Sequence, residues 1–387
     1  MRILYVAHNT DAGSGSNKSL VTLVAGVAKR GHEILVVCPN EKGLYEKLQA
    51  LSIPCVSCLY GDNAVDINNF HASPLRTLLR FCKSKYYSLK AIPKLLKTCR
   101  QFQPDIVHSN TSVTDLGWLL AKKLKCPHVW HLREYGDRDF DLRIPLLKRR
   151  IHSNGNYTIC VSNDVARHHQ VDGLKSNRVI YNGIINEAAP HTYSLGDEAY
   201  FLYASRCTEK KGFAELLKAY CAYCNAVEKP VKLVVTDTNS EDKRRMCPEV
   251  FADENISRNI RWIGHQKAIS ELYRQALAVI VPSQSEAFGR VVAEAMAEGC
   301  LVVGKNAGGV KEQLDNGVAR TGKEIGVRYD TTDDLSRILQ AIPTVDDSRY
   351  DEMRARAART VGVLYDADSY CCNVEQFYFD ILRCERH

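Results

Sequence analysis

The stretch AVIVPSQSEAFGRVVAEAMAEGCLVVG, residues 278–304, indicates the fold class of the second half of the chain. The apolar runs at its two ends have the length of buried strands, and the segment between them has the periodicity of a helix. The helical positions expected to face the core are Val292, Ala295, Met296 and Gly299. A strand, a turn, a helix and a second strand of this kind form one unit of a parallel α/β sheet.

The same alternation of strands and helices runs through both halves of the chain. The strand-like segments are RILYVA, EILVVC, DIVHS, HVWHL and YTICVS in the first half, and AYFLYAS, VKLVVTD, LAVIVPS and LVVG in the second. Strands without strict polar alternation, separated by helices, indicate parallel sheets covered on both faces. The segment 181–198, rich in Gly, Pro and Asn, is the natural linker between the halves.

We therefore predict an α/β fold of two doubly wound, Rossmann-like domains that face each other across a cleft. The first domain is expected over residues 1–185 and the second over residues 186–366. The helical C-terminal segment, 367–387, is expected to cross back to the first domain. A length of 387 residues is too great for one ordinary core, which agrees with two domains.

The composition predicts a soluble, cytoplasmic protein. No apolar run approaches the ~20 residues that span a bilayer, and the apolar stretch at the N-terminus is too short for a signal peptide. The fifteen cysteines are scattered along the chain without a secretion signal. We expect reduced thiols there, and neither a disulfide framework nor a zinc site.

Positive charge is concentrated in the first half. Residues 1–190 contain 26 Lys and Arg against 15 Asp and Glu, whereas the remainder contains 26 against 30. The first half should therefore meet an anionic partner. Nucleic acid is not expected, because no reader motif accompanies the charge. The glycine-rich GSGSNK segment fits neither the dinucleotide nor the P-loop pattern.

Two glutamates flank the start of the helix near Gly289. Glu286 follows the strand, at the edge where open α/β sheets bind ligands. Glu294 lies further along the helix, where an ion pair with Arg290 on a solvated face is the simpler interpretation. The free N–H groups near Phe288 and Gly289 carry the positive end of the helix dipole and suit a phosphate.

Two cations precede another helix of the same half. The segment SRCTEKKGF places Arg206 and Lys211 directly after the first strand of this half. Two cations and free helix N–H groups at one edge of a parallel sheet describe a diphosphate site. The carboxylates are then left to bind hydroxyl groups.

An ordered set of segments along nearly the whole chain resembles the retaining glycosyltransferases of family 4, which have the GT-B fold. The segments are GSGSNKSL, PDIVHSN, VWHLREY, VSNDV, VIYNGI, SRCTEKKG, WIGHQKAISELY, SEAFGRVVAEAMAEG and GKNAGGVKE. The similarity is tightest over residues 203–213 and 262–315. One such match would be unspecific, but the ordered set is specific.

The resemblance implies that the second domain binds a nucleotide-diphosphate sugar. Glu286 corresponds to the glutamate that holds hydroxyls of the donor sugar, and Glu294 to the one that holds the ribose. Arg206 and Lys211 correspond to the pair that neutralises the diphosphate. The remaining donor-binding positions of this domain are Phe288, Gly289 and Arg290.

The resemblance also implies roles for residues of the first domain. Gly15 corresponds to the second glycine of a loop that approaches the diphosphate, and Ser14 stands where the family usually has another glycine. His131 corresponds to a histidine beside the sugar and acceptor, although a satisfied histidine at a strand end explains it equally well. Asn182 belongs to the asparagine–glycine turn before the linker. The segment VVTDTN, 234–239, lacks the glycines common after that strand.

Carried over to this chain, the resemblance implies a retaining, metal-independent hexosyltransferase. It would move a sugar from a UDP- or GDP-linked donor to a hydroxyl of a glycan or of a polyprenyl- or lipid-linked acceptor bound by the first domain. It would need no resident cofactor and would act in bacterial cell-surface polysaccharide or lipopolysaccharide synthesis.

Two other functions fit parts of the sequence. Asp137, Asp139 and Asp141 in DRDFD form D-x-D pairs, which metal-dependent glycosyltransferases use to hold a divalent ion. Interleaved arginines favour a solvated loop at this position. The second alternative is a GT-B shell that serves as a non-catalytic scaffold or partner subunit. A degenerate shell should lose the paired glutamates or the Arg/Lys pair, and both are present.

The segment 75–100 mixes basic and apolar residues. No acidic residue lies between Asp66 and Asp105, and Pro74 and Pro93 suggest two short helices rather than one. Two interpretations stay open, a solvated basic face or a surface that lies on anionic lipid. The second would make the protein peripheral on the inner face of the cell membrane.

Overall fold

The chain forms two compact units. A computed structural model describes residues 1–184, 199–266, 268–342 and 348–385. Unit 1 is Met1–Ile184 with Ala367–His387, and unit 2 is Ile185–Asp366. Most of the predicted linker, residues 185–198, lies outside the described residues.

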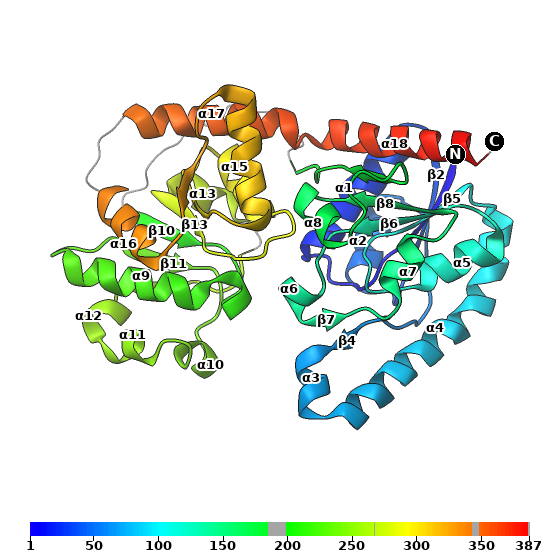
Figure 1. Ribbon diagram of the computed structural model, residues 1–387, viewed down its shortest axis with the longest axis horizontal. Helices are drawn as coiled ribbons and strands as arrows, with labels where there is room; N and C mark the ends of the chain where they lie inside the picture. Colours follow the sequence, from blue (N-terminus) through cyan, green and yellow to red (C-terminus); the bar gives the residue numbers. More distant parts are fainter. Residues whose placement is uncertain (185–198, 267, 343–347, 386–387) are drawn as a thin grey trace. The chain divides into compact units, whose positions relative to one another are not determined.

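Unit 1 is built on a seven-stranded parallel sheet in the order β3-β2-β1-β5-β6-β8-β9 (Figure 1). Its strands are β1 (Arg2–Val6), β2 (Glu33–Cys38), β3 (Cys55–Ser57), β5 (Ile106–Ser109), β6 (His128–Leu132), β8 (Asn156–Cys160) and β9 (Asn177–Val179). The chain runs outward from β1 to β3, then returns to β5 on the other side of β1. Ligands of open α/β sheets bind at the carboxyl end of such a reversal.

Helices cover both faces of this sheet. One apolar cluster joins Tyr5 and Val36 to residues of α1 and α18, and another joins Leu4 and Val6 to residues of α4 and α5. The helices of unit 1 are α1 (Gly15–Lys29), α2 (Leu44–Ala50), α3 (Ile67–Ala72), α4 (Pro74–Phe102), α5 (Leu116–Leu124), α6 (Asp137–Phe140), α7 (Leu147–Ile151), α8 (Asn163–His168) and α18 (Ala367–Cys384). The short strands β4 (Val65–Asp66) and β7 (Leu142–Arg143) form an antiparallel pair apart from the main sheet.

Unit 2 repeats the design with six parallel strands in the order β12-β11-β10-β13-β14-β15. Its strands are β10 (Tyr200–Tyr203), β11 (Lys232–Val235), β12 (Ile260–Trp262), β13 (Ala278–Val281), β14 (Val302–Lys305) and β15 (Val327–Tyr329). Its helical elements are the 3₁₀ turn η1 (Glu209–Lys211), α9 (Phe213–Ala226), α10 (Glu241–Arg244), α11 (Pro248–Ala252), α12 (Glu254–Ser257), α13 (Ser270–Gln275), α14 (Arg290–Ala297), α15 (Gly308–Thr321), α16 (Thr332–Ala341) and α17 (Ser348–Leu364). The strand order reverses between β10 and β13, so the carboxyl end of β13 is the expected ligand edge.

The predicted class, two doubly wound α/β domains, is confirmed. The 278–304 segment forms β13, α14 and β14, and the residues of α14 predicted to face the core are buried. All four residues of β13 are buried, because helices cover both faces of the sheet.

The prediction of two short helices around Pro93 is wrong. The residues form one helix, α4, of 29 residues, with Pro74 at its start and Pro93 inside it. Proline cannot donate a hydrogen bond to the carbonyl four positions earlier, which belongs to Leu89. Pro93 and Leu89 are both exposed, so water can bind the free carbonyl and the helix continues.

Membrane-spanning helices and disulfide bonds are both absent from the described part of the chain. Among the described helices, none is both long enough and apolar enough to cross a bilayer. All fifteen cysteines are free thiols.

Candidate functional site

The carboxyl edge of the sheet in unit 2 brings together two side chains that are 75 positions apart. Lys211 ends the turn η1, and its Nζ donates to Glu286 Oε1 at 2.7 Å. Thr208 caps that turn by accepting from the Lys211 N–H. Gly212 then has a φ of +70°, and an added Cβ would lie 2.1 Å from the Pro282 carbonyl oxygen. The glycine therefore allows the turn to pack directly on the end of β13, beside Glu286.

Glu286 is held in its ionised form. Burial raises the pKa of its carboxyl, but the charges of Lys211 and Arg206, together with the Lys211 hydrogen bond, outweigh burial and lower the pKa. Arg206 is exposed, and its charge contributes to the lowered pKa of Glu286. Of the three residues that the sequence predicts at this edge, the structure brings Lys211 and Glu286 into contact, and Arg206 acts on Glu286 through its charge.

The loop from Glu286 to Gly289 is fixed from behind by α15. The Gly309 N–H donates to the Glu286 carbonyl at 2.6 Å, and an added Cβ on Gly309 would lie 2.6 Å from the Phe288 carbonyl oxygen. Gln313 Nε2 donates to the carbonyls of Phe288 and Gly289 at 2.5 and 2.9 Å. The carbonyls are thus bound on the α15 side.

Gln313 is a residue that sequence reasoning missed. It is 1% exposed and lies in the middle of α15, where its spacing marks it only as one more position of a helix face. The GG pair before it signalled a turn, but nothing in the sequence indicates that the side chain reaches the loop 24 positions earlier.

Glu294 is on the first turns of α14, in the position that the sequence predicts. Its Oε1 accepts from Arg290 at 2.9 Å, so the expected ion pair is present. Both side chains remain about one-fifth exposed. Burial and then the charge of Glu294 raise the pKa of the Tyr273 hydroxyl, which indicates that this buried phenol lies beside the carboxylate.

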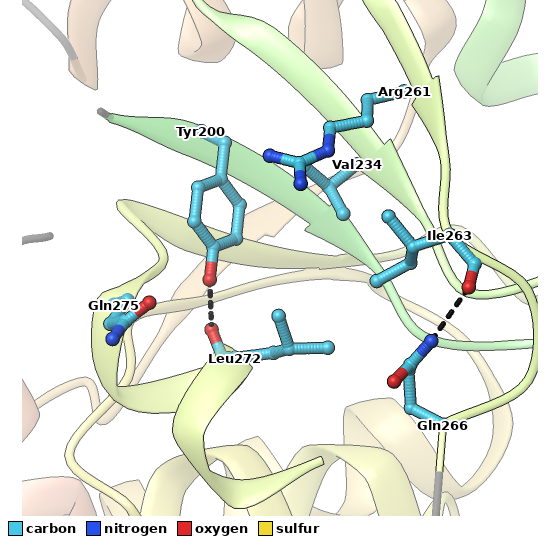
Figure 2. A pocket seen from close by; sticks show the side chains of 7 residues that line it. All are labelled: Tyr200, Val234, Arg261, Ile263, Gln266, Leu272 and Gln275. Carbon is cyan, nitrogen blue, oxygen red and sulfur yellow. Dashed lines mark hydrogen bonds between the residues drawn. The ribbon is translucent and has the colours of Figure 1, made fainter. Parts of the chain in front are cut away.

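A separate pocket of about 370 Å³ lies in unit 2 beside α13, and none of the predicted site residues lines it. Figure 2 shows two hydrogen bonds among its lining residues, from Tyr200 to the Leu272 carbonyl and from Gln266 to the Ile263 carbonyl. Its lining residues are Tyr200, Val234, Arg261, Ile263, Gln266, Leu272 and Gln275.

In unit 1, Arg133 organises the carboxyl edge of the sheet at the β1/β5 reversal. Its Nε donates to the carbonyl and side-chain oxygens of Asn110 at 3.1 and 3.0 Å, and its NH1 donates to Asn182 Oδ1. Its NH2 donates to the Tyr370 hydroxyl at 3.0 Å. No carboxylate among the described residues pairs with Arg133. The sequence prediction named Asn182 but missed Arg133, whose partners come from three distant segments.

His131 is buried next to Arg133. Burial, and then the charges of Arg133 and His108, hold the pKa of its imidazole well below the usual range. Its Nδ1 lies 3.2 Å from Arg133 NH2, and its Nε2 has no hydrogen-bond partner within the described part of the chain. A neutral imidazole with one free ring nitrogen can still bind a ligand.

Ser14 and Gly15 lie at the N-terminus of α1, on the same edge of unit 1. Ser14 is the N-cap, and its Oγ accepts from the Asn17 N–H. Asn17 in turn holds the preceding loop through Asn9 Oδ1 and the Asp11 carbonyl, at 2.7 and 2.9 Å. The serine that replaces the family's usual glycine therefore caps the helix.

The D-x-D residues have structural partners. Asp139 accepts from the N–H groups of Gly136 and Tyr135, at 2.8 and 3.1 Å, and so fixes the start of α6. Asp137 lies 3.0 Å from His168 Nε2. The DRDF segment is a short helix where a solvated loop was expected.

Two family models match the chain, one after the other. The model of Glycosyltransferase Family 4 matches residues 13–187, and that of Glycosyl transferases group 1 matches residues 187–357. Together they include every predicted site residue.

The curated relatives are distant. A 42.6 kDa protein of the cps region of Klebsiella pneumoniae is 21% identical over 77% of this chain and 83% of its own length. The N-acetyl-alpha-D-glucosaminyl L-malate synthase of Bacillus anthracis is 23% identical over 49% of this chain and 48% of its own. The chain thus spans about half the length of this second relative.

Among solved structures, Anabaena HepE in complex with UDP matches with a TM-score of 0.72 at 18% identity, over 97% of this chain and 99% of HepE. Identity this low shows a shared fold, and the predicted GT-B fold is confirmed.

Proposed function

Because the chain belongs to glycosyltransferase family 4 and is a glycosyltransferase, we propose that it transfers a hexose from a UDP- or GDP-linked donor to a hydroxyl group, with retention of configuration. The acceptor is a glycan or a lipid-linked glycan. The observation that carries the proposal is the Lys211–Glu286 contact at the ligand edge of unit 2. It combines an ionised acceptor for hydroxyls with a cation for phosphate.

The two cations stabilise the leaving diphosphate. The Lys211 ammonium has three donors, of which Glu286 uses one, and the others are available for phosphate oxygens. Arg206 adds a second positive charge that is exposed to ligand. Negative charge grows on the diphosphate as the bond to the sugar breaks, so fixed cations lower the barrier more than they strengthen ground-state binding.

The carboxylates recognise hydroxyl groups of the donor. An ionised carboxylate can only accept hydrogen bonds, and its two oxygens can bind neighbouring hydroxyls of one sugar ring. Glu286 would hold the transferred hexose and Glu294 the ribose. Arg290 fixes the orientation of Glu294 through the 2.9 Å ion pair. The Phe288–Gly289 segment supplies N–H groups on the side away from Gln313.

Transfer with retention needs no enzymic nucleophile. The anomeric carbon loses its bond to the diphosphate oxygen and gains a bond to the acceptor oxygen on the same face. The acceptor proton passes to an oxygen of the departing diphosphate. The protein then contributes orientation and charge, through Lys211 and Arg206, and no metal is required in this scheme.

The acceptor is proposed to be carried on a membrane lipid, because helix α4 exposes its apolar residues. Leu75, Leu78 and Leu79 are 70%, 53% and 62% exposed. Together with Cys82, Tyr86 and Leu89 they form one stripe along the helix. The opposite face, where Thr77 and Ser88 are buried, meets the rest of unit 1.

Basic residues flank this stripe. Arg76, Lys83, Lys90 and Lys94 are exposed and lie along one side of it. An apolar stripe beside cations is the pattern of a helix that lies on anionic lipid. Helices α3 and α4 run along the side of unit 1, and the N-terminal half of α4 extends beyond its sheet (Figure 1). The protein would then be peripheral on the cytoplasmic face of the membrane, in cell-surface polysaccharide synthesis. The cps-region relative from Klebsiella pneumoniae supports that assignment.

Flotation with anionic and neutral liposomes tests the membrane assignment. Changing Lys83, Lys90 and Lys94 to Glu should abolish binding to anionic vesicles, and high salt should weaken it in the wild type. Lys85 is left unchanged, because it forms an ion pair with the buried Asp115 and its loss would destabilise unit 1. Equal recovery with neutral and anionic vesicles would contradict the proposal.

A screen of nucleotide sugars by thermal shift, followed by product analysis, tests the reaction. The best donor should raise the melting temperature, and NMR should show the same anomer in product and donor. Excess chelator should leave turnover unchanged. Loss of activity in chelator that manganese restores would favour the D-x-D mechanism, and the absence of any stabilising nucleotide sugar would favour a non-catalytic scaffold.

A further inference from the structure

A buried phenol in unit 2 has no partner for its hydroxyl. Tyr273 belongs to α13 and is 1% exposed. Its hydroxyl forms no hydrogen bond of normal geometry with any residue in the described part of the chain. A buried hydroxyl in this situation is unfavourable, because it has given up its hydrogen bonds to water without replacing them. A partner that the hydroxyl meets only during function would explain why the residue is a tyrosine.

The neighbouring helix offers such a partner. Arg274, the residue after Tyr273, donates from its Nε to Glu298 Oε2 of the α14 end at 2.8 Å and so holds α13 against α14. Glu294 precedes Glu298 by four positions, which places both carboxylates on the same face of the helix. Burial, and then the charge of Glu294, raise the pKa of the Tyr273 hydroxyl well above its ordinary value. The phenol therefore keeps its proton and can donate it to a hydrogen bond.

The carboxylate of Glu294 has capacity for this donor. A carboxylate has about four acceptor sites, two on each oxygen. Arg290 NH2 occupies one of them, at 2.9 Å from Oε1. Two neighbouring hydroxyls of a ribose would occupy two more, which leaves one site for a donor from the protein. A single contact lets a carboxylate turn about it, whereas contacts on both oxygens fix its plane.

We propose that Tyr273 is a positioning residue, whose hydroxyl donates to the second oxygen of Glu294 when the ribose of the donor nucleotide binds. The Glu294 side chain is 22% exposed, so it has room for the small rotation that this contact needs. With Arg290 on one oxygen and Tyr273 on the other, the carboxylate is aimed at both ribose hydroxyls. The inference rests on the proposed function, because the ribose is the ligand there assigned to Glu294.

Removing the hydroxyl should not destabilise the protein. Tyr273→Phe keeps the ring, so its melting temperature without nucleotide should equal that of the wild type or exceed it. Tyr200→Phe is the matched control, because the Tyr200 hydroxyl donates at 2.9 Å to the Leu272 carbonyl of the same helix (Figure 2). That variant should melt at a lower temperature. An equal decrease in both variants would overturn the proposal, since it would show that the Tyr273 hydroxyl has a structural partner.

Nucleotide binding separates a positioning role from a structural one. UDP or GDP, whichever the wild type binds, is titrated into each variant alongside its 2′,3′-dideoxy counterpart. Tyr273→Phe should bind the ribonucleotide about tenfold more weakly than the wild type does, because a hydrogen bond to a charged group is lost. Its affinity for the dideoxy counterpart should equal that of the wild type, since Glu294 then has no hydroxyls to hold. Tyr200→Phe should match the wild type with both ligands.

Two results of these titrations would overturn the proposal alone. Equal weakening with both nucleotides would mean that Tyr273 supports the shape of the site and does not act through Glu294. Unchanged affinity of Tyr273→Phe for the ribonucleotide would mean that its hydroxyl makes no contact that matters for binding. A wild type that binds neither UDP nor GDP would instead refute the proposed function, and this inference with it.

Discussion

At the level of single residues, Lys211 and Glu286 stabilise each other's charge. The ammonium keeps the carboxyl ionised in a half-buried position, where burial alone would favour the protonated form. The carboxylate in turn holds the ammonium at the carboxyl edge of β13. A ligand that carries phosphate and hydroxyl groups can bind without separating the two, since an ammonium has three donors and a carboxylate can accept at both oxygens.

Glu134 should make folding stability depend on pH. Its carboxylate is 5% exposed, and burial raises its pKa to about 7, although the N–H and hydroxyl of Ser112 oppose that rise. A carboxyl whose pKa is raised in the folded state stabilises the fold below about pH 4.5, and this contribution is lost as the pH rises through about 7.

Glu134→Gln should remove that dependence. The free energy of unfolding of the variant, relative to the wild type, should increase by on the order of 2–3 kcal/mol between pH 5 and 8. Denaturant titrations of both proteins at several pH values measure this difference. A difference that stays constant with pH would mean that Glu134 titrates normally. The comparison cancels Asp62, whose pKa burial also raises, to about 6.

Gln313 should contribute to both stability and nucleotide binding. Gln313→Met keeps the volume but leaves the carbonyls of Phe288 and Gly289 without their donor, which should cost about 1–3 kcal/mol of stability. The loop should also bind nucleotide more weakly. Thermal unfolding and UDP titration measure the two effects. The control is Gln340→Met, because Gln340 lies on the next helix along the chain, α16, and within the described part of the chain its side chain bonds to Ser336 alone. Equal behaviour of the two variants would contradict the assigned role of Gln313.

Among the secondary-structure elements, α4 has one end that packs in the core and one end that is exposed. Leu95 is 2% exposed and belongs to the core, whereas Leu78 and Leu79 point to solvent. Leu95→Ala should cost about 2–5 kcal/mol of unfolding free energy. The double change of Leu78 and Leu79 to Ser should cost under about 1 kcal/mol and reduce binding to anionic liposomes. Strong destabilisation by the double change would indicate that the stripe packs inside the protein.

The sequence predicts the elements better than the contacts between them. Buried parallel strands have strong apolar runs, and two doubly wound α/β domains follow from their alternation with helices. The GT-B assignment came from the family resemblance. The helix break predicted at Pro93 was wrong because the effect of a proline depends on whether the freed carbonyl reaches water. The local sequence does not show this. Arg133 and Gln313 were missed for a related reason. Apart from the nearby His131, their partners are 23 or more positions away in the chain, so no local spacing indicates the contacts.

At the scale of the molecule, the C-terminal helix is part of the core of unit 1. Val374, Phe377, Tyr378 and Ile381 of α18 pack in the same cluster as β1 and α1. A chain that ends at residue 366 should therefore lose protection from hydrogen exchange throughout unit 1 while unit 2 keeps it. Asn373→Ala, at an exposed position of α18, is the control and should change nothing. Unchanged protection of unit 1 in the chain that ends at residue 366 would show that unit 1 folds without α18.

The sharpest test of the proposed donor site is the turnover of a nucleotide sugar by Lys211→Met, with Lys218→Met as the control. Lys218 is an exposed lysine of α9, in the next helix along the chain. We expect Lys211→Met to fold like the wild type but to lose about 10²–10³-fold in kcat, because one donor to the leaving diphosphate is gone. Lys218→Met should keep wild-type turnover. Wild-type turnover in Lys211→Met would contradict the assignment of the Lys211–Glu286 pair as the centre of the reaction.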